Sequence, residues 1–220
     1  MNILTLTMNP AIDMSTEVPH ISPEHKLRCS PPRYEPGGGG INVSAVIREL
    51  AGESTAVFPC GGPPGRMLKR LLRGKGIPFE SVEIGEWTRW NFSALERSGG
   101  SQYRFVMPGA EVTREEQDAC LDIIRTFSPA PDSIVISGSF PPGVPPGFIR
   151  ELIQTANSLK AAVTVDTSGE PLRHAAEEGV FLLKPNMNEL SELAGSGLDT
   201  ETKQEHALRE LVKSGGCEAA

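Results

Sequence analysis

The chain has 220 residues, of which 38% are hydrophobic, enough for one sizeable core. Its 28 acidic and 21 basic residues give a net charge of −7, which opposes nonspecific binding to nucleic acid or to an anionic membrane. Neither a basic leader region nor a run of eighteen apolar residues is found, so we expect a cytoplasmic, soluble protein. The cysteines and histidines show no metal-ligand spacing.

Strand-like and helix-like segments alternate along the chain, which is typical of an α/β fold with a largely parallel sheet. The run 133–137 is apolar enough to be buried on both faces and is predicted to be a central strand. Thr113 and Glu116 predict a capping box at the start of the helix before it. Further strands are expected over residues 3–8, 54–60, 77–84, 162–165 and 181–183.

Two stretches, about 13–35 and 87–106, interrupt this alternation and are richer in polar and β-forming residues. They alternate as half-exposed strands do, so we expect a small sheet outside the main one. Such a sheet would act as a lid over a cleft, or would form a homodimer by packing its apolar face on a second copy.

The sequence after residue 200 predicts a helix over 202–213, a Ser-Gly-Gly stop and then four residues where another strand would begin. A parallel sheet that lacks strands would leave apolar helix faces uncovered. We therefore expect residues 1–220 to form one domain that is incomplete at its C-terminus, the alternative being a frayed natural end.

The run Glu-Pro-Gly-Gly-Gly-Gly-Ile-Asn-Val at 35–43 is the most informative feature. Val43, Val46, Ile47 and Leu50 follow helical spacing, so the glycines are predicted to lie at a helix N-terminus, where free amides favour a phosphate or a polar sugar. Neither the Walker pattern nor Gly-x-Gly-x-x-Gly fits this spacing. The alternative is a loop that needs glycine for its turns alone.

Five motifs together resemble the ribokinase-like (PfkB) family of carbohydrate kinases, in the order in which that family has them, and the resemblance covers essentially the whole chain. They are Asn9–Asp13, Gly37–Asn42, Trp87–Asn91, Ser137–Gly143 and Lys184–Glu189. The resemblance implies a three-layer α/β/α fold with a mostly parallel sheet and a small β-sheet lid.

Within the family the sequence is most similar to the minor-type 6-phosphofructokinases, at residues 26–29, 34–40 and 102–109. The 1-phosphofructokinases and tagatose-6-phosphate kinases usually have lysine third in Gly-Gly-Lys-Gly, where this chain has Gly39. The resemblance implies transfer of the γ-phosphoryl group of ATP, with Mg²⁺, to the C1 hydroxyl of fructose 6-phosphate, giving fructose 1,6-bisphosphate in glycolysis. Either related kinase is an alternative, as is a non-catalytic module for sugar-phosphate binding or dimerisation.

The resemblance assigns the sugar side of the site to the first half of the chain. Asp13, expected at the carboxyl end of the first strand, is suited to accept hydrogen bonds from two sugar hydroxyls. An Asp that caps the turn after Asn9 is the alternative. The main chain of Gly38 and Gly39 and the amide of Asn42 would contact the sugar, as their family counterparts do.

Cations for the phosphoryl groups are expected on the lid. Arg89 and Arg104 lie on lid-like strands, and arginine can grip a phosphate with two hydrogen bonds. Lys26 and Arg28 are two residues apart, so we expect them to share a strand face, with Lys26 as an auxiliary catalytic charge. Ser139 resembles the family's phosphate-contacting serine. Surface charges and a turn hydroxyl are the alternatives.

Asn186 and Glu189 form the Asn-x-x-Glu element that the family uses to organise magnesium and the ATP phosphates, with Glu189 as metal ligand. The same pair also predicts a capping box that needs no metal. Lys184, on the preceding strand, favours the phosphate role because a cation there can touch a phosphate at the same helix end. The family's catalytic base, an Asp in a Gly-Ala-Gly-Asp turn, is absent. We therefore expect negligible turnover from these residues alone.

Overall fold

The main sheet of the computed structural model, which describes residues 1–220, has seven strands, all parallel. They are β1 (Ile3–Leu6), β4 (Thr55–Cys60), β5 (Phe79–Glu83), β8 (Ser133–Ser137), β9 (Ala162–Asp166), β10 (Val180–Leu183) and β11 (Cys217–Ala219). Their order across the sheet is β11-β10-β9-β8-β1-β4-β5. The predicted central strand, β8, is confirmed in the middle.

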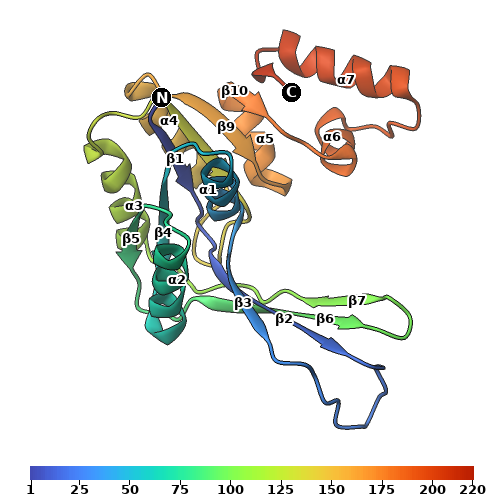
Figure 1. Cartoon of the computed structure of the whole chain (residues 1–220). Coiled ribbons are helices and arrows are strands. Elements are labelled where there is room, and N and C mark those ends of the chain that lie inside the picture. Colours follow the sequence, from blue (N-terminus) through green and yellow to red (C-terminus); the bar gives the residue numbers. More distant parts are fainter.

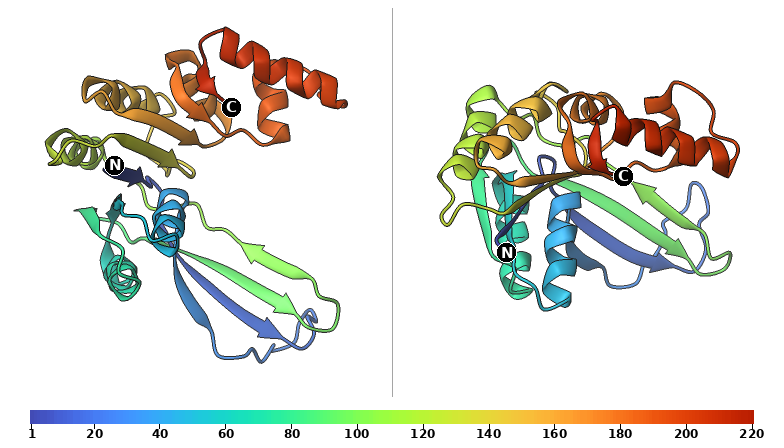
Figure 2. Two further views of the ribbon diagram at one scale, coloured as in Figure 1. Left: turned by 45° about the horizontal axis from the view of Figure 1, so that its top comes forward. Right: turned by 90° about the horizontal axis from the view of Figure 1, so that it is seen from above.

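Helices cover both faces of this sheet, as the expected three-layer fold requires (Figures 1 and 2). Helices α1 (Gly39–Glu49) and α2 (Gly62–Gly74) pack on one face, and α3 (Arg114–Thr126), α4 (Phe148–Ser158) and α5 (Gly169–Glu178) pack on the other. Helix α7 (Glu201–Lys213) packs against β11, and α6 (Met187–Ala194) packs against α7 and α5. None of the helices is long and apolar enough to cross a membrane.

The predicted capping box at the start of α3 is confirmed. The amide of Glu116 donates to Thr113 Oγ1 over 3.3 Å, and the amide of Thr113 donates to Glu116 Oε2 over 2.8 Å. The other carboxylate oxygen, Oε1, accepts a hydrogen bond of 2.8 Å from the amide of Gly85. Glu116 therefore accepts a hydrogen bond from a main-chain amide at the start of α3 and also links α3 to the segment that follows β5.

The glycine run opens a helix, as predicted, but the apolar residues at helical spacing are not the most buried residues of α1: Val43 and Ile47 are only half-buried. Val46 and Leu50 are 53% and 78% exposed, whereas Ile41 and Ser44 are buried. Small residues at the start of α1 let the helix lie close to β1, where Ser44 Oγ is 2.8 Å from Thr5 Oγ1. Close approach of the backbones, rather than apolar spacing, therefore decides which face of α1 is buried.

The small sheet expected outside the main one is present, and its strands follow the order β3-β2-β6-β7. It consists of β2 (Ala11–Val18), β3 (Arg33–Gly37), β6 (Arg89–Glu96) and β7 (Gln102–Phe105). Strands β2 and β6 are parallel, and the other pairs are antiparallel. This lid projects away from the main sheet in Figures 1 and 2.

Residues that are paired across a sheet share a face, so the register shows which side chains lie together. By this register the lid has one polar and one apolar face. The register places Asp13, Arg89, Asn91 and Arg104 on one face. Aromatic side chains gather on the other face, where Tyr34 packs edge-on against Trp90 (5.9 Å between ring centroids) and Phe92 stacks on Phe105 (5.8 Å).

The expectation that Lys26 and Arg28 share a strand face is wrong. Strand β2 ends at Val18 and β3 begins at Arg33, and residues 19–32 form no strand. This segment contains four prolines, which have no amide hydrogen to contribute to a ladder (Pro19, Pro23, Pro31 and Pro32).

Candidate active site

The strand order reverses between β1 and β8. From β1 the chain continues to β4 and β5 in one direction across the sheet, and from β8 it continues to β9, β10 and β11 in the other. Open α/β sheets bind ligands in the crevice outside the carboxyl ends of the two strands at such a switch point. The glycine turn and the segments after β1 and β8 meet here, so this crevice is the candidate active site.

The glycine turn fits this crevice because of its missing side chains. Gly38 has φ +123°, a conformation that L side chains rarely adopt. A Cβ at Gly39 would lie 2.6 Å from the amide of Gly138 and would overlap Ser137 Oγ. No side chain caps α1 at Gly38. The amide of Ile41 donates to Thr7 Oγ1 over 2.9 Å, which leaves the amides of Gly39 and Gly40 suited to receive a polar or anionic ligand group.

Asp13 does not lie at the end of the first strand, as expected from the sequence, but is the third residue of the lid strand β2. Strand β1 already ends at Leu6, and a short connection leads into the lid. The half-buried Asp13 accepts a hydrogen bond of 2.8 Å at Oδ1 from Asn91 Nδ2. Its carboxylate therefore lies on the polar face of the lid, next to the glycine turn.

The two predicted lid arginines differ in their surroundings. The guanidinium of Arg89 donates to Met107 O over 2.7 Å and to Asn9 O over 3.0 Å, while Nε is buried without a partner. Burial lowers the pKa of Arg89, and neighbouring Asp13 opposes this effect. Arg104 is exposed and makes no hydrogen bond or salt bridge. Arg104 is therefore the freer of the two to receive a phosphate.

Ser139 and Asn42 border the same crevice from two sides. Ser139 Oγ accepts a hydrogen bond of 3.1 Å from Asn9 Nδ2, which links the segments after β1 and β8. Asn42 lies exposed in the first turn of α1, and its amide side chain makes no hydrogen bond. The site thus presents one hydroxyl that is held in place and one amide that is free.

Lys26 and Arg28 are not brought to Asp13 within this chain. Both are exposed and make no hydrogen bond or salt bridge. Their segment leaves β2 at Val18, whereas Asp13 lies near the other end of that strand (Figure 1).

The Asn-x-x-Glu element forms the capping box that the sequence left open as an alternative. Asn186 Oδ1 accepts from the amides of Asn188 (2.9 Å) and Glu189 (3.0 Å), and Glu189 Oε2 accepts from the amide of Asn186 over 2.7 Å. The capping contacts leave Glu189 Oε1 unused. A role at a nucleotide remains a prediction.

Lys184 takes part in a polar chain across the carboxyl ends of three strands. Its Nζ donates to Asp166 Oδ1 over 3.0 Å, and Asp166 Oδ2 accepts a hydrogen bond of 3.3 Å from Ser137 Oγ. This chain connects Lys184 with the residue that faces Gly39. Sequence reasoning assigned no site role to Asp166, although its position at the end of an apolar strand was an available signal.

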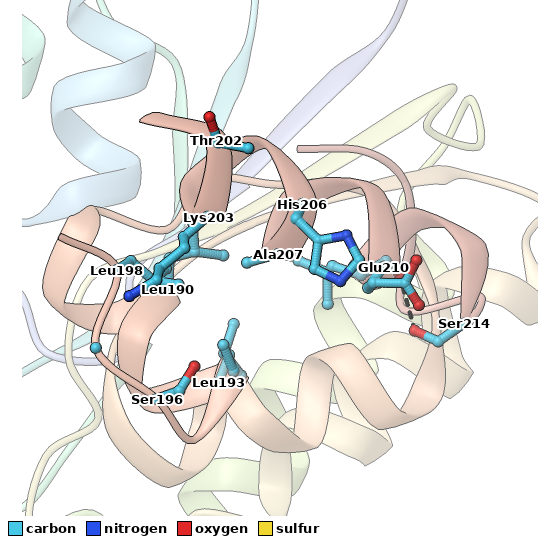
Figure 3. Close-up of a pocket in the computed structure, with 13 residues that line it drawn as sticks. Leu190, Leu193, Ser196, Leu198, Thr202, Lys203, His206, Ala207, Glu210 and Ser214 are labelled. Carbon is cyan, nitrogen blue, oxygen red and sulfur yellow. Dashed lines mark hydrogen bonds between the residues drawn. The ribbon is translucent and has the colours of Figure 1, made fainter. Parts of the chain in front are cut away.

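A cavity of about 870 Å³ lies away from this crevice, between α6 and α7 (Figure 3). Its apolar wall includes Leu190 and Leu193 of α6 and Ala207 of α7, and polar side chains of α7 line its rim. It contains none of the predicted site residues, so cavity size alone does not indicate the active site.

The chain matches the family model of pfkB family carbohydrate kinases over residues 3–219. It belongs to this family. The seven-stranded parallel sheet, the lid and the glycine turn described above are the parts of the molecule that this match covers.

Two relatives and one solved structure are especially similar. The chain is 44% identical to the ATP-dependent 6-phosphofructokinase isozyme 2 of Mycobacterium tuberculosis, over 98% of this chain and 63% of that protein. It is 43% identical to the Escherichia coli isozyme 2, over 97% of this chain and 69% of that protein. A crystal structure of E. coli phosphofructokinase-2 with fructose-6-phosphate superposes with a TM-score of 0.94 at 42% identity, over 98% of this chain and 71% of the other. The chain thus spans roughly two thirds of the length of these relatives.

Proposed function

We propose that this chain is the sugar-binding part of a 6-phosphofructokinase, which transfers the γ-phosphoryl group of ATP to the C1 hydroxyl of fructose 6-phosphate. The observation that carries the proposal is the convergence of Asp13, the glycine turn and the polar lid face at the switch point. The names of the two relatives and the ligand of the E. coli structure agree with it.

In this proposal the sugar phosphate is held by both hydrogen-bond acceptors and hydrogen-bond donors. Asp13 accepts hydrogen bonds from sugar hydroxyls, and the amides of Gly39 and Gly40 at the start of α1 donate to sugar oxygens. Arg104 binds the 6-phosphate, and Ser139 and Asn42 contribute neutral hydrogen bonds. Arg89 can bind the phosphate only if it gives up its hydrogen bonds to the main-chain carbonyls of Met107 and Asn9. Fixed donors and acceptors of this kind hold the sugar in the geometry that phosphoryl transfer requires.

The nucleotide side is proposed at the start of α6, where Lys184, Asn186 and Glu189 lie. Glu189 Oε1 is not used in capping, which suits Mg²⁺, because this ion binds few protein carboxylates and keeps water and phosphate oxygens as its other ligands. When bound, the ion neutralises charge on the ATP phosphates. Lys184 and the α6 N-terminus attract the same phosphates.

Residues 1–220 contain no Gly-Ala-Gly-Asp turn, the element in which the family places its catalytic base. We expect these residues alone to bind the sugar phosphate and to turn over negligibly. Release of ADP that depends on fructose 6-phosphate, measured in a coupled assay on the 220-residue chain, would contradict this expectation.

A homodimer through the apolar lid face is part of the proposal. Tyr34 and Trp90 are 38% and 37% exposed, and Phe105 is 51% exposed, although these rings lie together on one face. Aromatic patches of this kind are typical of interfaces. Sedimentation of wild type against Phe105→Glu tests it: we expect loss of the dimer, and an unchanged mass would exclude this face.

The sugar assignment is tested by calorimetric titration with fructose 6-phosphate, fructose 1-phosphate and tagatose 6-phosphate. We expect fructose 6-phosphate to bind most tightly and Asp13→Asn to abolish binding. Asp122→Asn is the matched control, because Asp122 is an exposed carboxylate of α3 paired with Arg125. Tighter binding of either other sugar would favour the corresponding kinase instead.

A further inference from the structure

Asn91 lies between the carboxylate of Asp13 and the main chain of Met107, and it contacts both. Its Nδ2 donates to Asp13 Oδ1 over 2.8 Å, and its Oδ1 accepts a hydrogen bond of 3.3 Å from the amide of Met107. The β2–β6 register places Asn91 directly opposite Asp13, and both residues are half-buried. Asn91 is therefore the side chain that joins the candidate sugar ligand to the rest of the lid.

These two contacts fix the direction in which the Asn91 amide points. Turning an asparagine amide by 180° exchanges its donor and its acceptor. The main-chain amide of Met107 needs an acceptor, and the carboxylate of Asp13 needs a donor. Only one orientation satisfies both neighbours, and it directs the NH₂ group to Asp13.

Arg89 holds the same segment from a second position. It precedes Asn91 by two residues on the same face of β6, and its guanidinium donates to the carbonyl of Met107 over 2.7 Å and to that of Asn9 over 3.0 Å. Both the amide and the carbonyl of Met107 are thus bound by side chains of one strand. The acceptor side of Asn91 is consequently supported by more than one hydrogen bond.

The other oxygen of Asp13 faces the glycine turn. The carboxylate occupies the space that a side chain at Gly37 would need, with Oδ2 nearest to that position. Asn91 engages Oδ1, whereas Oδ2 accepts no hydrogen bond within the chain. One oxygen is therefore held, and the other is directed toward the crevice where α1 begins.

We propose that Asn91 is a positioning residue, which holds Oδ1 of Asp13 so that Oδ2 is presented to a hydroxyl of the sugar. The inference rests on the proposed sugar-phosphate function and extends it to a residue that does not itself touch the sugar. A carboxylate fixed before binding loses no rotamer freedom when the sugar arrives, so losing Asn91 weakens binding of fructose 6-phosphate.

The test is calorimetric titration of fructose 6-phosphate into wild type, Asn91→Ala and Asn91→Asp. We expect Asn91→Ala to weaken binding about 10- to 100-fold, the ratio for losing a hydrogen bond to a charged group. Ser93→Ala is the matched control, because Ser93 lies on the same strand and face and makes no side-chain hydrogen bond. It should bind as wild type does. Equal affinities of Asn91→Ala and wild type would overturn the proposal.

Asn91→Asp supplies a readout that a merely structural role would not change. It places two carboxylates within hydrogen-bond distance, on a lid face where Arg89 is a neighbouring cation. Their repulsion is relieved when one takes up a proton. Relative to wild type at each pH, we expect the affinity of this variant to be lowest at pH 8 and to recover toward pH 5.5. A ratio that does not change with pH would count against the proposal.

Failure of the proposed function can be told apart from failure of this inference. If wild type binds none of the three sugar phosphates, the function is wrong, and the Asn91–Asp13 contact is judged by urea unfolding alone. A double-mutant cycle of Asn91→Ala and Asp13→Ala should then show coupling between the two residues. Additive effects in that cycle would overturn the positioning role.

Discussion

Helix α4 buries six of its eleven residues against the main sheet, whereas helix α7, with thirteen residues, buries none. The first helix belongs to the body that carries the proposed sugar side of the site, and the second lies over the last strand, β11. Burial of apolar area is the main source of stability, so the two regions contribute to it unequally. Packing therefore preorganises the proposed sugar side, whereas the α6–α7 region is held mainly by local bonds.

The largest expected effect comes from removing a core side chain on the sugar side. Phe58 of β4 is fully buried in a cluster with Ile12 and Ile41, on the sheet face that α1 and α2 cover. We expect Phe58→Ala to lower the free energy of unfolding by about 3–5 kcal/mol. Leu211→Ala in α7 should cost less than about 1 kcal/mol, since Leu211 is only partly buried. Urea unfolding of both variants measures the two losses of unfolding free energy. Equal losses would show that the two regions contribute equally to stability.

Sequence patterns predicted those features of the fold that depend on neighbouring residues. The strand at 133–137 and the capping boxes at Thr113 and Asn186 are where the sequence indicates them, because an apolar run or a side-chain cap acts within a few residues. The sequence did not predict which face α1 buries, because that depends on the distance between α1 and β1.

The site could be predicted less completely, for the same reason. The glycine turn is evident from its composition, but the sequence places Asp13 at the wrong strand, because the turn at Asn9-Pro10 does not show that the chain leaves the main sheet there and starts a strand of the lid. Asn91 lies within a matched motif, yet its contact with Asp13 depends on a register between segments 78 residues apart. The shared strand face of Lys26 and Arg28 was wrong because a spacing of two residues does not show that a strand forms, and the prolines of residues 19–32 oppose one.

A smaller effect is expected from removing the cap of α6. Asn186→Ala deletes the acceptor of two amides and should cost about 1 kcal/mol. Because α6 lies in the loosely packed region, the loss should appear as faster hydrogen exchange confined to α6 and α7, with little change in global unfolding. Asn188→Ala is the control, since only its main-chain amide takes part in the cap. An equal loss in the free energy of global unfolding would show instead that α6 and α7 unfold together with the rest of the molecule.

The lid offers a test that depends on pH. The amide of Ile21, and after it the hydroxyl of Ser98 and the ring of His20, hold the pKa of Glu96 below its ordinary value of 4.5. Glu96 therefore contributes stability that is complete above pH 4.5 and is lost as the pH falls through the lower pKa of the folded state. The gap in unfolding free energy between wild type and Glu96→Gln should thus narrow below pH 4.5.

Glu24→Gln is the control for this measurement, because Glu24 is exposed and makes no hydrogen bond or salt bridge. Its unfolding free energy should follow that of wild type at every pH. A gap for Glu96→Gln that stays constant down to pH 3 would mean that the lid contacts of Glu96 do not stabilise the fold.

The smallest expected effect is measured without a substitution, from the rates at which the four cysteine thiols react with a reagent. Cys29 is exposed, whereas Cys60, Cys120 and Cys217 are buried, and burial raises the pKa of Cys120 to about 12. With a thiol reagent at pH 8 we expect Cys29 to react at once, Cys217 of β11 next through local opening, and the other two only with global unfolding. Equal reaction rates of Cys217 and Cys120 would show that β11 opens no more readily than the core does.

The parallel pairing of β2 with β6 also bears on the order in which the molecule folds. These strands join segments 78 residues apart, and neither is the neighbour of the other along the chain. Closing so long a loop costs entropy before any ladder bond is made, so distant pairings form slowly. We therefore expect pairs of strands that are close along the chain, such as β2–β3 of the lid and β8–β9 of the main sheet, to gain protection in pulse-labelled hydrogen exchange before the β2–β6 and β1–β8 pairs do. A nascent chain would then have the carboxylate of Asp13 beside its glycine turn, through β2–β3, before it has Asn91 opposite that carboxylate.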